Sequence, residues 1–350
     1  MAVRFETLGA ILAHGWDSVI DVRSPAEFAE DHVPGAVNLP AMSNDERAQV
    51  GTIYKQVSPF KARKIGAAIV ARNVAAHLEG PLAARDGGWR PLVYCWRGGQ
   101  RSGSVATILT QVGWRTETIA GGYQSFRRLV HAAVYEAHFP ARIVLIDGNT
   151  GTAKTAVLAR LAARGHQVID LEAMAGHRGS LLGATEAGQP SQRAFETRIA
   201  VALAGLDPAR PVAVEAESSK IGRLIVPPAL WAAMCAAPRI DLVAPLEARA
   251  AYLVEAYADV IADPARLADL LQPLRHHRGH GVVDGWLALL AQGAHRALAA
   301  ALITDHYDPA YARSRAVHRP AVVGQAVAGR LDAAGIDALA AQAEALISAI

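Results

Sequence analysis

The sequence predicts an α/β protein of two domains, each built on a parallel sheet, the second ending in a mainly helical region. Three observations predict this fold class. The 350 residues exceed the usual size of one domain. Short apolar strands alternate with helical segments both before and after Pro140, the pattern of parallel α/β units. From about residue 245 onward the chain is alanine-rich with helical spacing.

The first predicted domain covers residues 1–138. Strands are expected at 18–23 ("SVIDVR") and 91–96 ("PLVYCW"). A capped helical turn and a Pro-Gly turn follow the first strand, and a helix follows the second. The stretch "TETIAGGYQSFRRLV" then supplies a strand, a Gly-Gly turn and a helix. Residues 43–80 form a more basic insertion, which we expect to be helical.

The second predicted domain covers residues 139–350. It opens with the strand "IVLID", a glycine turn and a helix, and "HQVIDLE", "RPVAVEAES" and "APRIDLVAP" provide further strands. The part beyond about residue 245 is expected to be mainly helical. The stretch Tyr307-Asp308-Pro309 is interpreted as a turn without a role, and the last thirty-odd residues add no motif.

Bulk properties exclude several classes of protein. The most apolar window contains Gln292, His295 and Arg296, so no membrane span is expected. The N-terminus lacks the features of a signal peptide, and a cytoplasmic protein is expected. Two cysteines are too few for a disulfide framework or a structural zinc site, and Cys235 is interpreted as a buried apolar residue. A net charge of +3 does not by itself indicate nucleic acid.

The other cysteine, Cys95, ends a predicted strand just before a helix. Loop amides, the helix N-terminus and the side chains of Arg97 and Arg101 would all favour its thiolate. Five residues separate Cys95 from Arg101, the spacing of cysteine phosphatases, but Tyr94 replaces the histidine common in those enzymes. Spacing alone therefore leaves a phosphatase and a sulfur or selenium carrier open. The predicted active-site loop comprises Cys95, Trp96, Arg97, Gly98, Gly99, Gln100, Arg101 and Ser102.

A second loop, "GNTGTAKT", fits a Walker A phosphate-binding loop in all positions but one, where Ala153 replaces glycine. Its backbone amides and Lys154 would hold phosphate oxygens, and Thr155 is a candidate Mg²⁺ ligand. The candidate partner carboxylates are Asp170, Glu172, Glu215 and Glu217. None follows the usual run of apolar residues, so a diphosphate other than ATP stays open. The predicted phosphate-binding residues are Gly148, Asn149, Thr150, Gly151, Thr152, Ala153, Lys154 and Thr155.

Taken together, these motifs carry a family resemblance. "DVRSPAEFAEDHVPGAVNLP", "YCWRGGQRSG" and "IAGGYQSFR" resemble the rhodanese family in order and spacing. With "GTIYKQVSP", "GNTGTAKT", "HRGSLLG", "QPSQRAFE", "VEAESSKIG" and "YDPAY", residues 10–315 resemble the bacterial tRNA 2-selenouridine synthase family. Departures are Ala153 and Gln100, and the cysteine loop has one residue more than in common rhodaneses. The resemblance implies a rhodanese-like domain followed by a P-loop NTPase-like domain.

The resemblance also implies an activity. A family member replaces the sulfur of 2-thiouridine at the wobble position of tRNA with selenium, through an S-geranyl intermediate. The implied co-substrates are selenophosphate and geranyl diphosphate, with Mg²⁺ a candidate and no haem, flavin or structural metal. The implied partners are tRNA and, functionally, the enzyme that supplies selenophosphate. Cys95 would carry selenium as an S-selanyl adduct. Weaker candidates as accessory residues are Arg178, Glu196, Glu215 and Arg223.

Three other functions stay open. A P-loop kinase or NTPase with a sulfurtransferase domain would turn over ATP, and a cysteine phosphatase would hydrolyse an aryl phosphate through Cys95. A non-enzymatic tRNA-binding adaptor would need neither Cys95 nor Lys154. The histidines at 276, 277 and 280 are interpreted as part of a solvated basic loop rather than as a metal site.

Overall fold

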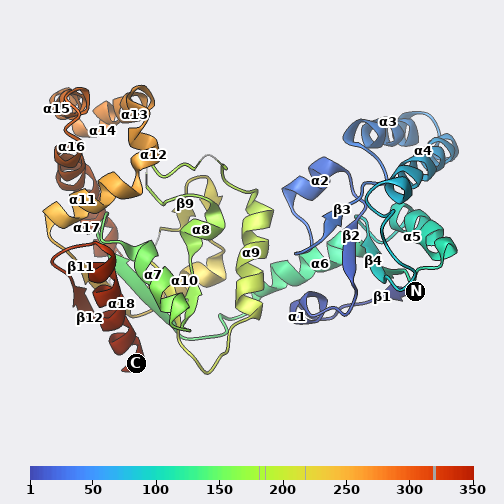
Figure 1. Cartoon of the computed structure of the whole chain (residues 1–350), viewed down its shortest axis with the longest axis horizontal. Helices are drawn as coiled ribbons and strands as arrows, with labels where there is room; N and C mark the ends of the chain where they lie inside the picture. Colours follow the sequence, from blue (N-terminus) through green and yellow to red (C-terminus); the bar gives the residue numbers. More distant parts are fainter. Residues whose placement is uncertain (181, 186, 217, 318–320) are drawn as a thin grey trace. The chain divides into compact units, whose positions relative to one another are not determined.

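A computed structural model describes residues 1–180, 182–185, 187–216, 218–317 and 321–350. Contacts divide the chain into two compact units. The first contains Met1–Ala137 together with Pro190–Gly205, and the second contains His138–Gln189 and Leu206–Ile350 (Figure 1). Among the described residues, no helix combines the length and the hydrophobicity that crossing a bilayer requires.

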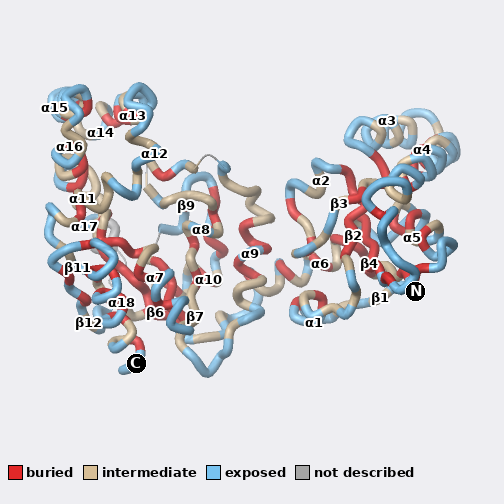
Figure 2. The backbone as a smooth tube through the Cα atoms, in the orientation of Figure 1, coloured by how far each residue is buried: buried red, intermediate tan, exposed pale blue. Residues whose placement is uncertain are grey.

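The first unit is built on a five-stranded sheet in the order β1-β5-β4-β2-β3. All four strand pairs are parallel, as the sequence predicts. The two central strands are fully or largely buried (Figure 2). The strands are β1 (Ala2–Val3), β2 (Ser18–Asp21), β3 (Val37–Asn38), β4 (Pro91–Tyr94) and β5 (Glu117–Ile119).

Local signals explain the helices of this unit. The basic insertion is helical as predicted: a Ser43–Glu46 capping box starts α3, and Ser58 caps α4 with Pro59 at its first position. Buried residues of α4 join the core of the sheet. The helices are α1 (Leu8–Leu12), α2 (Pro25–Glu30), α3 (Asn44–Gln56), α4 (Pro59–Glu79), α5 (Gln100–Val112), α6 (Gly122–His131), the π-helical η1 (Ala132–Glu136) and α9 (Gln192–Ala204).

The helix α9 is inserted in the sequence of the second unit but packs in the first. The Thr197 hydroxyl donates to Asp31 at 2.9 Å, and the Arg193 guanidinium pairs with Glu30 at 2.9 Å. The sequence predicts that residues 139–350 form the second domain. The contacts of residues 190–205 place this helix with the first unit.

The second unit has a parallel sheet in the order β12-β11-β6-β8-β7. Four of its strands lie where the sequence predicts them. The edge strand β12 was not predicted, because the region beyond residue 245 was expected to be mainly helical. The strands are β6 (Ile143–Gly148), β7 (Gln167–Ile169), β8 (Val212–Glu215), β11 (Arg239–Val243) and β12 (Val322–Val327).

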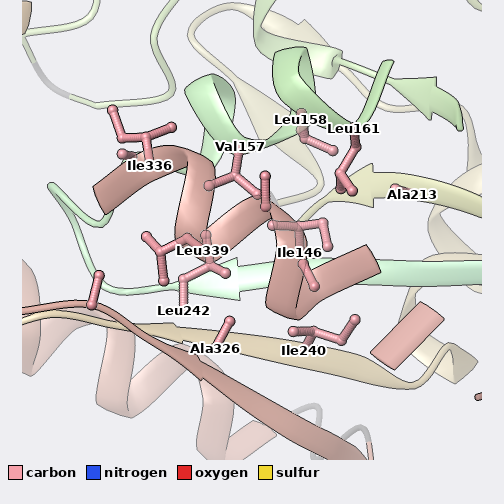
Figure 3. Close-up of a cluster of buried hydrophobic side chains, with 14 of the residues drawn as sticks. Ile146, Val157, Leu158, Leu161, Ala213, Ile240, Leu242, Ala326, Ile336 and Leu339 are labelled. Atoms are coloured by element: carbon pink, nitrogen blue, oxygen red, sulfur yellow. The ribbon is translucent and has the colours of Figure 1, made fainter. Parts of the chain in front are cut away.

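The end of the chain completes the core of this unit. Leu339 of α18 and Ala326 of β12 are fully buried with Val157 and Leu161 of α7 (Figure 3). The last thirty residues therefore help to hold α7, the helix that follows the phosphate loop. The helices near the sheet are α7 (Lys154–Ala163), α8 (Leu171–Ala175), α10 (Pro228–Ala236) and α18 (Ala333–Ser348), and β9 (Lys220–Ile221) pairs with β10 (Leu224–Ile225).

The helical region lies between β11 and β12, and one prediction about it is wrong. Tyr307-Asp308-Pro309 was expected to form a turn, but Tyr307 ends η3 and Asp308 begins α17. Pro309 fits there because proline is tolerated in the first turn of a helix. The elements are α11 (Leu246–Ala256), α12 (Ala258–Ile261), α13 (Pro264–Leu271), the 3₁₀-helical η2 (Gln272–Leu274), α14 (Arg275–Arg278), α15 (His280–Ala291), α16 (His295–Leu302), the π-helical η3 (Ile303–Tyr307) and α17 (Asp308–Val317).

Candidate active sites

Cys95 lies directly after β4, in the loop that leads into α5. It is buried, and its Sγ lies 3.2 Å from the Ser102 hydroxyl. Burial alone would raise the pKa of the Cys95 thiol. Hydrogen bonds from the Ser102 hydroxyl and from the amides of Ser102, Gly99 and Arg97 together outweigh burial and lower the pKa. The loop therefore favours a thiolate, the nucleophilic form of cysteine.

Two glycines give the cysteine loop its shape. Gly98 has φ +68°, and a Cβ there would lie 2.8 Å from the Ile119 carbonyl oxygen. A Cβ on Gly122 would lie 2.2 Å from the carbonyl oxygen of Cys95. The Tyr123 amide donates to that same carbonyl at 2.8 Å. The Gly-Gly-Tyr motif at the start of α6 thus closes directly on the backbone of the cysteine.

The two arginines of the loop differ in their surroundings. Arg101 pairs with Glu27 at 2.9 Å, whereas the Arg97 side chain is exposed. Burial would raise the pKa of Glu27, but the hydrogen bond and the positive charge of Arg101 lower the pKa of Glu27 overall. The contacts of the thiol come from Ser102 and backbone amides, so thiolate stabilisation by the two guanidinium groups stays a prediction. Gln100 is exposed as the first residue of α5.

A buried network that the sequence analysis missed supports the loop. Arg23 pairs with Asp21 at 2.6 Å, and its guanidinium carbon lies 3.9 Å from the Tyr123 ring centre. The Tyr123 hydroxyl donates to Asp31 at 2.8 Å. The Trp96 ring lies 5.3 Å from that of Tyr123. The sequence motif "DVR" could have indicated this network, because the charged residues Asp21 and Arg23 lie at the end of a buried strand.

Glu196, a candidate accessory residue, belongs to this same unit. It lies on α9, forms an ion pair with Arg127, and accepts a hydrogen bond from the Tyr135 hydroxyl at 2.7 Å. The Gln192 amide group donates to it at 3.0 Å. These contacts tie α9 to α6 and η1, and an accessory role for Glu196 stays a prediction.

The phosphate loop connects β6 to α7, as the motif requires. Gly148 has φ +157° and Gly151 has φ +84°, and the Lys154 ammonium donates to the Gly148 carbonyl at 3.2 Å. Thr152 folds back on the loop through its hydroxyl, which donates to the Asn149 carbonyl at 2.9 Å. The loop therefore has the curved backbone and the lysine of a phosphate cradle.

Ala153 carries the strain expected from its place in the motif. Its φ of +61° and ψ of +32° lie in the left-handed region, and among the described residues it is the only non-glycine with positive φ. A β-carbon in this conformation costs about 1–2 kcal/mol.

Thr155 faces two carboxylates. Its hydroxyl lies 3.1 Å from Glu172 Oε2 and 3.2 Å from Glu215 Oε1. Of the other candidates, Asp170 caps α8 by accepting from the Ala173 amide at 2.8 Å, and Glu217 lies outside the described residues. A hydroxyl and two carboxylates are a donor set that suits Mg²⁺. Within the described parts of the chain, no group of three or more His, Cys, Asp or Glu residues could hold a metal.

A buried arginine, also missed by the sequence analysis, holds the phosphate loop. Arg249 donates through Nε to the Thr150 carbonyl at 2.9 Å and pairs through Nη2 with Asp308 at 2.6 Å. Asp308 belongs to the "YDPAY" motif, for which no role was predicted. Its role is to orient the arginine that supports the loop.

A cavity of about 230 Å³ opens over the phosphate loop. Lys154, Thr155, Glu172 and Glu215 line it, and so does Arg178. The Arg178 guanidinium pairs with Asp259 at 2.5 Å, which keeps its side chain at the wall.

An apolar pocket of about 60 Å³ adjoins this cavity. Thr150, Leu253 and Tyr257 line both spaces. Burial raises the pKa of Tyr257 to about 12, so its hydroxyl stays neutral. The remaining lining comes mainly from α12, α13 and α16 and is almost entirely aliphatic: Leu182, Val254, Val260, Ile261, Leu267, Leu298, Ala299 and Leu302, with His295 and Tyr307.

Arg223 lies outside both lined spaces, in the turn between β9 and β10. Its amide donates to Gln189 Oε1 at 2.8 Å, and its Nη2 donates to the Gln189 carbonyl at 2.6 Å. These contacts tie the hairpin to the segment before α9.

A cysteine loop at the end of a parallel strand in the first unit and a P-loop in the second unit define a rhodanese-like domain joined to a P-loop domain. The comparisons agree: a Rhodanese-like domain model matches residues 5–129, and a tRNA 2-selenouridine synthase AAA domain model matches residues 141–272. The chain belongs to the tRNA 2-selenouridine synthase family, whose members are enzymes.

Similarity to curated relatives extends over both units. The tRNA 2-selenouridine synthase of Hahella chejuensis is 34% identical over 331 residues, which is 84% of each chain. That of Aeromonas salmonicida is 34% identical and covers 84% of this chain and 86% of its own. That of Verminephrobacter eiseniae is 36% identical, with coverages of 85% and 88%.

Proposed function

We propose that the chain converts 2-thiouridine at the wobble position of tRNA to 2-selenouridine through S-geranyl-2-thiouridine. The observation that carries the geranyl step is the apolar pocket beside the phosphate cavity. A prenyl diphosphate has a charged head for the phosphate cavity and an aliphatic tail for the apolar pocket, whereas the polar edge of a nucleobase would find few hydrogen-bond partners in a mainly aliphatic lining. Each methylene buried there contributes about 0.8 kcal/mol.

In the first step, the sulfur of 2-thiouridine attacks C1 of the geranyl group. The carbon–oxygen bond breaks, and diphosphate leaves with the electron pair. Lys154 and the loop amides stabilise the charge that develops on the leaving group. Mg²⁺ held by Thr155, Glu172 and Glu215 would supply further charge neutralisation. Arg178, which lines the cavity, would contact the same diphosphate.

In the second step, selenium replaces the alkylated sulfur. S-geranyl-2-thiouridine, selenophosphate and water give 2-selenouridine, geranylthiol and phosphate, a balance without net oxidation. Geranylation helps because an alkylated sulfur leaves C2 more readily than an unmodified one. We assign Cys95 to this step as the selenium carrier. An S-selanyl form is two electrons more oxidised than selenide, so loading Cys95 from selenophosphate requires a two-electron oxidant such as a disulfide, which is reduced to two thiols. Discharge of the selenium as selenide oxidises two thiols back to a disulfide, so the two half-steps together leave no net oxidation.

These assignments also give the partners. The substrates would be a tRNA and the product of a selenophosphate-forming enzyme. An enzyme acting on tRNA would work in the cytoplasm, where its substrate is found.

The test of the geranyl step is calorimetric titration with geranyl diphosphate, pyrophosphate and ATP. Ala299 on α16 lines the apolar pocket, whereas Ala297 on the same helix is exposed and does not. We expect Ala299→Phe to weaken geranyl diphosphate binding about tenfold or more without changing pyrophosphate binding, and Ala297→Phe to change neither. Geranyl diphosphate binding no tighter than pyrophosphate binding would refute the proposal. Tight ATP binding with turnover would favour the P-loop kinase or NTPase instead.

A further inference from the structure

The helical insertion of the first unit has an unusual charge. Residues 47–78 contain no Asp or Glu. They hold three of the five lysines in the chain, Lys55, Lys61 and Lys64, together with arginines at 47, 63 and 72. Arg47 is paired with Glu27 at 3.0 Å. Lys55, Lys61, Arg63 and Lys64 leave a positive surface around the junction of α3 and α4, because the acidic residues of the insertion lie at the opposite ends of these helices: Asp45 and Glu46 at the start of α3, and Glu79 at the end of α4.

Exposed apolar rings lie at the same junction. Tyr54 is 53% exposed and Phe60 is 71% exposed, with Val57 between them at 63%. α3 ends at Gln56 and α4 begins at Pro59, so these side chains flank the connection between the helices. Aromatic rings interleaved with lysines are the combination that binds single-stranded nucleic acid, where rings stack on bases and cations contact phosphates.

A cavity of about 540 Å³ connects this surface to the cysteine loop. Tyr54, Arg63 and Gly66 line it from the insertion, and Gln100, Arg101 and Ser104 line it from α5. Its size lies in the range of about 300–1,000 Å³ typical of small-ligand sites. The first turn of α5 also carries Ser102, the partner of the Cys95 thiol. A base that entered this cavity would approach the cysteine loop.

We propose that the α3–α4 insertion binds a single-stranded RNA loop, stacks bases on Tyr54 and Phe60, and admits one base into the cavity. This inference rests on the proposed function for the identity of the RNA, the anticodon loop of tRNA. It requires no chemistry at the phosphate loop. A purely electrostatic surface would need the lysines but not the exposed rings.

The test is fluorescence anisotropy of the full chain with a labelled, unmodified anticodon stem-loop at several salt concentrations. Stacking is worth about 1–3 kcal/mol per base, so Tyr54→Ala and Phe60→Ala should each weaken binding about 5- to 150-fold. Tyr54→Phe and Phe60→Tyr keep the ring and should bind within about twofold of the wild type.

Lys55→Gln, Lys61→Gln and Lys64→Gln together should reduce the slope of log Kd against log salt by about 2. The matched control changes Arg115, Arg266 and Arg296, which are exposed outside the insertion, to glutamine and should leave the slope unchanged. Unaltered pyrophosphate binding by every variant would show that the phosphate loop is intact.

The possible failures separate the two proposals. If the wild type binds the stem-loop and the two alanine variants bind equally well, the insertion is not the stacking surface. A loss confined to the lysine variant points to an acidic partner of any kind and also overturns the inference. If the wild type binds no RNA at all, the tRNA assignment of the proposed function fails together with it.

Discussion

Replacing Ala153 by glycine should stabilise the protein, although glycine usually destabilises folded chains. Ala153 has φ +61° in the loop before α7, which costs a residue with a β-carbon about 1–2 kcal/mol. Glycine removes this strain but gives the unfolded chain more freedom, which costs about 0.5–1 kcal/mol. The net gain should be about 0.5–1 kcal/mol, which raises Tm by about 1–4 °C for a unit of this size.

The assay is differential scanning calorimetry of the full chain, and Ala159→Gly is the matched control. Ala159 is exposed in the interior of α7, where glycine costs about 1 kcal/mol. The control therefore lowers Tm and identifies the transition of the second unit. Ala153→Gly should raise that same transition. If both substitutions lower it by similar amounts, the strain at Ala153 and the reasoning from it are wrong.

Three further predictions concern the two loops. In a Cys235→Ser background, Ser102→Ala should raise the pKa of Cys95, because the hydroxyl that favours the thiolate is lost. Thiolate absorbance at 240 nm is followed against pH. The midpoint with Ser102 present should lie below that of an ordinary thiol, and the midpoint of the Ser102→Ala variant should be higher. An unchanged midpoint would contradict the assigned role of the hydroxyl. Gly122→Ala should shift the same titration upward, since its Cβ would lie 2.2 Å from the Cys95 carbonyl and must displace the loop; an unshifted curve would count against this packing. Asp308→Asn should lower the free energy of unfolding in urea by about 2 kcal/mol, less than the 3–5 kcal/mol of a fully buried pair, because Asp308 is 32% exposed. The same substitution should weaken pyrophosphate binding. Unchanged stability and binding would show that Arg249 does not support the phosphate loop.

Most of both sheets could be predicted because their signals are local. A short apolar strand, a glycine turn and a helix follow one another along the chain, and the loops that carry Cys95 and Lys154 lie at such junctions. The packing of Gly122 against the cysteine backbone gives the physical reason for the Gly-Gly-Tyr motif, which sequence could only recognise by resemblance.

The features that were missed depend on contacts between distant parts of the sequence. Nothing local indicates that α9 packs in the first unit, since the hydrogen bond from Thr197 joins residues 166 positions apart. The support of Thr150 by Arg249 likewise depends on the folding of α11 against the loop. The strand β12 follows a long helical region and lies at a sheet edge with most of its residues exposed, so its sequence shows no continuous apolar run.

The central claim is that one chain performs alkylation at the phosphate loop and selenium transfer at the cysteine loop. The most direct measurement supplies 2-thiouridine tRNA, geranyl diphosphate and selenophosphate, digests the tRNA and identifies the nucleosides by mass. Lys154→Ala should abolish S-geranyl-2-thiouridine, whereas Cys95→Ala should accumulate it and form no 2-selenouridine. Normal formation of 2-selenouridine by Cys95→Ala would contradict the carrier role, and geranylation by Lys154→Ala at the wild-type rate would contradict the role of the phosphate loop.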